Sequence, residues 1–142
     1  MKTLVSCIAM FMVAAVAAQV TFTSVAKGDR SGQQLARQVT IRTPSEWKAL
    51  WKDHAPADAM PTIDLAKSMV VGIFLGTKPS AGYEVEIVGV KHEGKDLVVE
   101  YVQKQPPPGT MTAQILIEPF HLVSVPKHDG PVRFVQNLKS KN

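Results

Sequence analysis

Four histidines are the side chains of this chain whose type is best suited to catalysis or metal binding. They are His54, His92, His121 and His128, and no two have the His-x-His or His-Glu-x-x-His spacing that places metal ligands side by side. His54 falls at the end of a predicted helix, where a cation complements the helix dipole, and His121 lies between two apolar neighbours. We interpret all four as structural residues and predict neither a metal site nor a cofactor.

Serine-based hydrolysis has no supporting motif in the sequence. Such chemistry often uses a Gly-x-Ser-x-Gly turn, which the chain lacks. Asp53 and His54 are adjacent, but neighbouring positions on a helix do not face each other. No glycine-rich phosphate loop is present either. We therefore predict that the chain is not an enzyme. A hydrolase using His121 or His128 is the third-ranked alternative, to be abandoned if His→Ala variants keep any observed activity.

The segment 76–83 has the residue types of a binding loop on a rigid scaffold. One interpretation is an ordinary connector with a core-facing tyrosine, and the other is a recognition loop. The second rests on a fixed dihedral at the proline, a permitted positive φ at the glycine and the amphipathic tyrosine ring. Its candidate partner-binding residues are Lys78, Pro79, Ser80, Gly82 and Tyr83.

A run of prolines in the segment 105–109 is the second candidate surface. Pro106, Pro107 and Pro108 have no backbone donors, so they cannot form part of a sheet ladder. Prolines that are already extended lose little entropy on binding, which favours a contact surface.

The amino-terminal segment has the composition of a secretory signal peptide. Lys2 precedes an apolar run that ends in small residues, and we predict cleavage near Ala18–Gln19. An uncleaved membrane anchor is the alternative. A lipoprotein through Cys7 is disfavoured because the most apolar stretch follows that cysteine. Since Cys7 is the only cysteine, an exported chain starting at Gln19 has no thiol and no disulfide. We expect a periplasmic or extracellular protein.

The charge of the chain excludes one class of partner. The formal net charge is +4, but lysines and arginines are scattered rather than clustered. Binding to nucleic acid needs a clustered basic footprint, so we predict no nucleic-acid partner. We also predict no membrane span in the mature chain, and a protein partner, with an exported protease as the candidate.

The rest of the sequence predicts an α+β fold built mostly of antiparallel strands, as a sheet, sandwich or partial barrel. Residues 35–142 form one domain, preceded by a lead-in over 19–34 that is either flexible or holds a short strand at 20–25. The best local signal is a helix over about 44–54, with Thr43 as its cap and Trp47, Leu50 and Trp51 on one face. Strands are predicted at 39–43, 68–76, 83–90 with a bulge near 88–89, 97–104, 115–118, 120–125 and 132–138.

The order of these motifs resembles the carboxy-terminal domain of PrcB, a protease-complex subunit. The resemblance covers residues 39–134 and implies a secreted or lipid-anchored bacterial module with an accessory, non-catalytic role that binds or stabilises an exported protease. Ala81 stands where that family has a second glycine. The motifs are Glu46-Trp47-x-x-x-Trp51, Ile63-Asp64-Leu65-x-Lys67-x-Met69-Val70-Val71-Gly72, Gly76-x-Lys78-Pro79-x-x-Gly82-Tyr83-x-Val85-x-Ile87, Pro106-Pro107-Pro108-Gly109 and Pro119-Phe120-His121-Leu122-Val123-x-Val125-Pro126-Lys127.

Two functions remain at this point. The first is a secreted, non-catalytic module that binds or stabilises an exported protease. The second is a protease inhibitor acting through the Lys78–Tyr83 loop, which has a loose likeness to the wedge loops of chagasin-like inhibitors. Inhibition assays against several protease classes discriminate between them.

Overall fold

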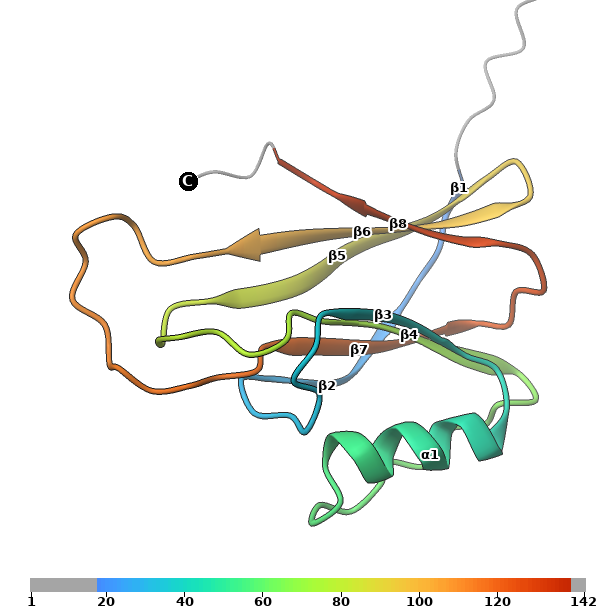
Figure 1. Cartoon of the computed structure of the whole chain (residues 1–142). Helices are drawn as coiled ribbons and strands as arrows, with labels where there is room; N and C mark the ends of the chain where they lie inside the picture. Colours follow the sequence, from blue (N-terminus) through green and yellow to red (C-terminus); the bar gives the residue numbers. More distant parts are fainter. Residues whose placement is uncertain (1–17, 139–142) are drawn as a thin grey trace, which may run out of the picture.

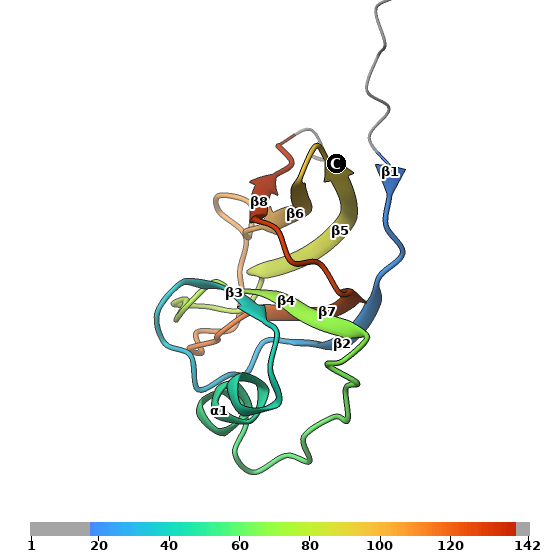
Figure 2. The same cartoon turned by 90° about the vertical axis from the view of Figure 1, so that its right-hand side faces the viewer.

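The computed structural model describes residues 18–138, and these form two β-sheets and one helix. The sheets lie face to face, and the helix covers the outer face of one of them (Figures 1 and 2). The predicted signal peptide, apart from Ala18, lies outside the described residues. The predicted α+β sandwich is confirmed. The first sheet has the strand order β1 (Ala18–Gln19), β5 (Glu84–Glu93), β6 (Asp96–Lys104) and β8 (Val132–Gln136), and the second has the order β2 (Thr23–Gly28), β7 (Phe120–Pro126), β4 (Ser68–Phe74) and β3 (Arg37–Ile41).

Strand β4 is the most buried strand because it has a partner layer on each face. It lies between β7 and β3, and six of its seven residues are buried. Alternate residues such as Met69 and Val71 face the other sheet, whereas Val70 and Phe74 face the helix. The continuous apolar run seen in the sequence is the pattern expected of a strand covered on both sides. The strand ends at Phe74, two residues before the predicted end.

The helix α1 (Pro44–His54) begins and ends where the sequence predicts. The Thr43 hydroxyl accepts a hydrogen bond from the Glu46 amide at 3.2 Å. The same hydroxyl donates a hydrogen bond to the Glu46 carboxylate at 2.9 Å, so Glu46 contacts the side chain of the cap residue. Two tryptophans pack this helix on the second sheet, and their indole N–H groups donate to Pro61 and Asp58 carbonyls, each at 3.0 Å. The helix therefore also holds the connector that follows it.

The bulge expected near Val88–Gly89 is present in β5. The register with β6 shifts between Ile87 and Gly89, and Val88 faces solvent. The shift explains why the apolar residues change phase within one strand. Strand β5 consequently keeps Val85, Ile87 and Val90 in the core between the sheets.

Three sequence expectations differ from the structure. In the lead-in 19–34, for which flexibility or a short strand at 20–25 was expected, the strand is present but lies at Thr23–Gly28 as β2, which pairs antiparallel with β7. The predicted strand 115–118 is wrong, because Ile117 makes only an isolated bridge with Lys78. Strand β8 ends at Gln136 rather than 138, and it runs parallel to β6. Long-range pairing decides all three, and local composition carries little signal for it.

Candidate functional site

A cleft of about 740 Å³ lies at the end of the sandwich where the long loops gather. Three chain segments form it: the loop between β4 and β5, the end of β6 with the proline run, and the end of β8 with the two residues that follow it. Figure 1 shows these segments at the same end of the molecule. The volume is in the range of small-ligand and peptide pockets. Its lining residues are Lys78, Tyr83, Gln103, Lys104, Gln105, Pro106, Pro107, Pro108, Gln136, Asn137 and Leu138.

Two glycines with positive φ shape the wall formed by the β4–β5 loop. Gly76 has a φ of 76°, and a Cβ there would lie 2.8 Å from the Ala36 backbone nitrogen. Gly82 has a φ of 100°, and a Cβ there would lie 3.0 Å from the Pro106 side chain. Both positions thus need a left-handed conformation, and the first also needs a close backbone approach. The second glycine brings the two walls of the cleft into contact.

Hydrogen bonds hold the same loop to the loop that joins β6 and β7. Lys78 and Ile117 exchange two backbone hydrogen bonds, at 2.7 and 3.1 Å, and the Ala81 amide donates to the Ala113 carbonyl at 3.0 Å. Ser80 is buried, and its hydroxyl donates to the carbonyl of Ala81 at 3.1 Å. The Lys78–Tyr83 loop is therefore a supported wall and not a projecting wedge.

Lys78 and Tyr83 form the polar-aromatic part of this wall. The Lys78 ammonium lies 5.5 Å from the centroid of the Tyr83 ring, within the range of a cation–π contact. Both residues are partly exposed and line the cleft. The tyrosine thus presents its ring to the cleft, contrary to its interpretation as a core-facing residue.

The β6–β7 loop, residues 105–119, also carries exposed apolar side chains. Met111 is 98% exposed, Leu116 72% and Ile115 48%. The loop starts in the cleft wall and returns beside Lys78 at Ile117. Exposed apolar side chains thus follow the cleft wall along the chain, and such groups can mark an interaction site.

The structure brings together five of the eight predicted site residues. Lys78, Tyr83 and the three prolines line the cleft, and Gly82 supports Pro106. Pro79 and Ser80 do not line it. Gln105 lines the cleft as part of the predicted 105–109 surface. The other lining residues were not predicted, because they have little local signal and the parallel pairing of β8 was not foreseen. These residues are Gln103, Lys104, Gln136, Asn137 and Leu138.

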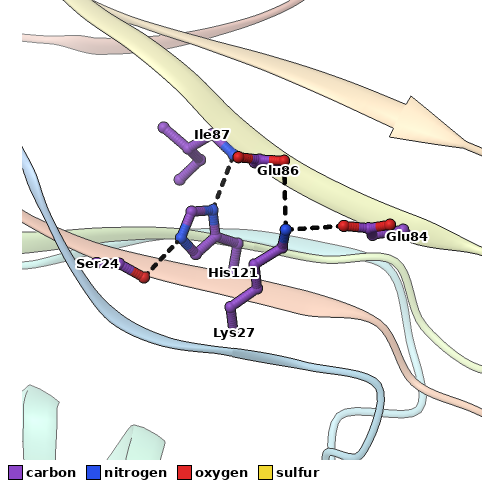
Figure 3. A network of polar contacts seen from close by, with 6 residues as sticks. All are labelled: Ser24, Lys27, Glu84, Glu86, Ile87 and His121. Carbon is purple, nitrogen blue, oxygen red and sulfur yellow. Dashed lines mark hydrogen bonds and ion pairs between the residues drawn. The ribbon is translucent and has the colours of Figure 1, made fainter.

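A second polar group of residues lies between the sheets and is centred on His121 (Figure 3). The backbone N–H of Ile87 donates to His121 Nδ1 at 2.9 Å, so that nitrogen carries no proton. The proton of the neutral ring is therefore on Nε2, which lies 2.9 Å from Ser24 Oγ and donates to it. Burial, and next the positive charge of Lys27, lower the pKa of His121. Because its lone pair is already used, the ring is not placed to take a proton from Ser24.

Lys27 links the two sheets at the edge of this network (Figure 3). Its ammonium lies 2.8 Å from Glu84 and 3.3 Å from Glu86. The hydrogen bond with Glu84 is the main reason that the pKa of Lys27 is raised, and the same bond lowers the pKa of Glu84. Lys27 comes from β2 and the glutamates from β5, so the contact joins strands of different sheets.

His54 is the second buried histidine. It packs on Phe120 with ring centroids 4.3 Å apart, and its Nδ1 lies 2.7 Å from Ser31 Oγ. Burial lowers the pKa of His54, which disfavours the charged ring expected at the helix end. The neutral ring instead packs in the core. The interpretation of His54 and His121 as structural residues fits their partners.

The other two histidines lie near each other at the other end of the sandwich. The ring centroids of His92 and His128 are 5.2 Å apart. Within residues 18–138, no group of three or more His, Cys, Asp or Glu side chains is arranged to hold a metal ion. Within the same residues, no helix combines the length and apolar character that crossing a membrane requires.

Comparison with known proteins gives one match. Residues 69–126 match the model of the family described as PrcB C-terminal. No curated protein and no solved structure gives a significant match. The matched segment runs from β4 through β7 and contains both the β4–β5 loop and the proline run.

Proposed function

We propose a non-catalytic accessory role toward an exported protease, exerted through the cleft. The support from the comparisons is that residues 69–126 match the family described as PrcB C-terminal. The family supports a protease-complex accessory module. The observation that carries the proposal is the convergence of Lys78, Tyr83 and the three prolines with the segment after β8 on one open cleft.

The arrangement of the cleft suits binding better than chemistry. Its surface combines an aromatic ring, prolines and side-chain amides, which supply contact area and hydrogen bonds without a general base. No histidine, serine, aspartate or glutamate is among its lining residues. The prolines and the buried supports of the β4–β5 loop pre-form the surface, so little conformational entropy is lost when a partner binds.

An affinity experiment tests this role. Immobilised full-length protein is exposed to exported proteins of the source organism, and the proteolytic activity retained on the support is measured. We expect wild type and the Lys95→Gln control, which changes an exposed lysine in the β5–β6 turn, to retain the same protease. Tyr83→Ala is expected to lose it. Retention of no protease by wild type, or equal retention by Tyr83→Ala, contradicts the proposal.

The same experiment separates an accessory role from inhibition. An inhibitor lowers the turnover of the retained protease as more protein is added, whereas an accessory factor maintains or raises it. The inhibitor hypothesis placed a projecting loop at Lys78–Tyr83. In the structure that loop is bonded to the β6–β7 loop, which instead carries the fully exposed Met111.

We also propose export of the chain, with residues 1–18 as the leader. The support is the apolar run behind Lys2 and the small residues before Gln19. Cleavage there keeps every strand from β2 onward. Mass spectrometry of the protein from its host is expected to find Gln19 as the first residue. An intact Met1 or a lipid on Cys7 would overturn the proposal.

A further inference from the structure

The side chains around the cleft match the needs of an extended peptide. Such a peptide presents backbone N–H groups and carbonyls that must find partners when they leave water. Gln103, Gln105 and Gln136 each offer both a donor and an acceptor. Across the described residues, the side-chain amides of these three glutamines are engaged in no hydrogen bond within the chain. They are thus available to a peptide backbone.

The apolar part of the cleft provides positions for side chains. Tyr83, the three prolines and Leu138 are the apolar residues of its lining, and Leu138 is 73% exposed. Prolines and an aromatic ring hold a fixed shape, so an aliphatic side chain resting on them adds contact area at little entropic cost. Peptide residues that alternate between this wall and solvent match the two-residue period of an extended chain.

The charge of the cleft has one sign. Lys78 and Lys104 line it, and no carboxylate does. The nearest acidic side chain in the strand register is Glu84, opposite Lys104, and Glu84 is already bonded to Lys27 at 2.8 Å. Glu86 also binds Lys27, so both of these glutamates are paired with a lysine outside the cleft, whereas the two lysines of the lining have no carboxylate beside them in the lining. A carboxylate on the ligand fits that imbalance.

Building on the proposed function, we infer that the cleft binds an extended acidic segment of the partner protein. In this arrangement an aspartate or glutamate side chain of the segment lies toward Lys78 and Lys104. A neighbouring aliphatic side chain rests on Tyr83 and the prolines. The recognised carboxylate is a side chain within the segment and not a chain terminus.

Selection from a peptide pool tests this inference. The probe is a random octapeptide pool, acetylated and amidated at its ends so that only side chains contribute charge. Full-length protein is immobilised, and the retained peptides are sequenced. We expect aspartate and glutamate to be enriched about fivefold over the input, which corresponds to about 1 kcal/mol for two exposed ion pairs. The enrichment is expected to fall at high salt.

Matched variants assign that enrichment to the cleft. Lys78→Gln combined with Lys104→Gln is expected to keep retaining aliphatic peptides but to lose the acidic preference. Lys95→Gln is expected to behave as wild type. Since these lysines are all on the surface, thermal melting will verify that each variant is folded.

The outcomes distinguish this inference from the proposed function. Retention of peptides without an acidic preference, or with enrichment of lysine and arginine, overturns the inference and leaves the accessory role standing. If no peptide is retained, or if retention is the same in Tyr83→Ala, both the inference and the proposed function are overturned. If the protein binds no peptide but sediments with vesicles of phosphatidylglycerol and phosphatidylcholine, the cleft binds a lipid surface. That result would also overturn the inference.

Discussion

Polar side chains are used differently between the sheets and in the cleft. Between the sheets, each ring nitrogen of His121 has one partner inside the chain, and Lys27 bridges two glutamates. In the cleft, Gln103, Gln105 and Gln136 are exposed, and the other lining residues are mostly proline, tyrosine and leucine. Both regions combine polar groups with apolar neighbours, but the histidine has internal partners on both ring nitrogens, whereas the three glutamine side chains of the cleft have none among the described residues.

This difference separates stability from binding. A buried polar group with an internal partner stabilises the fold chiefly by avoiding the cost of being unpaired. A polar group on a rigid, open surface contributes little to folding and remains free to recognise another molecule. We therefore expect substitutions between the layers to change the free energy of unfolding, and substitutions in the cleft to change peptide binding.

The largest effect is expected for Phe74→Ala. Phe74 is almost fully buried and contacts the rings of His54 and Phe120, with centroids at 5.5 and 6.0 Å. Removing the ring leaves a cavity between the second sheet and the helix, which lowers the free energy of unfolding by about 3–5 kcal/mol. Urea denaturation measures it. A loss below about 1 kcal/mol would show that this layer is not a packed core.

A smaller loss of stability is expected for His121→Leu. The buried Ile87 amide loses its partner, at a cost of about 1–3 kcal/mol, whereas Ser24 is exposed and its hydroxyl bonds to water instead. The matched control is His92→Leu, since His92 is exposed and is expected to change stability by less than about 0.5 kcal/mol. Equal losses in both variants would contradict the structural role of His121.

Acid is expected to destabilise the fold in a definite pH range. Burial lowers the folded-state pKa of His54 and His121 below the ordinary 6.5, so the unfolded chain binds more protons just below that pH. The two neutral histidines contribute fully to the free energy of unfolding above pH 6.5. This contribution is lost as the pH falls below that value and through their lowered pKa values. Urea midpoints measured from pH 8 to pH 5 check the direction. The His121→Leu variant should show a shallower dependence, and a steeper one would count against the assignment.

The smallest change in stability is expected in the cleft. Lys104→Gln and Gln105→Ala alter exposed side chains, so unfolding should change by less than about 0.5 kcal/mol. Lys104→Gln should nevertheless weaken retention of acidic peptides, whereas Gln105→Ala should weaken retention of all peptides alike. Thermal melting and peptide retention are compared on the same preparations. A variant that loses both together would remove the distinction between the regions.

The sequence predicts those parts of this molecule that depend on local residues. The cap at Thr43, the helix to His54, the buried run in β4 and the bulge at Val88 each have a local signal. Strand β2 and the parallel β8 had only weak local signals, because pairing with β7 and β6 decides them.

Some residues of the candidate site could likewise be predicted from local sequence, and others could not. Tyr83 and the prolines stand out by residue type, so the sequence identified both surfaces. That the two surfaces form one cleft follows from the fold, which places Pro106 against Gly82 and brings the end of β8 beside them. Gln136 and Leu138 join the site only through that topology.

Site-specific photocrosslinking tests the central claim most directly. A benzoylphenylalanine is placed at position 107, in the cleft wall, or at position 95, in the turn between β5 and β6, and each protein is irradiated with the exported proteins of the source organism. We expect position 107 to crosslink to a protease and position 95 not to do so. Equal crosslinking from position 95, or no protease crosslinked from position 107, would contradict it.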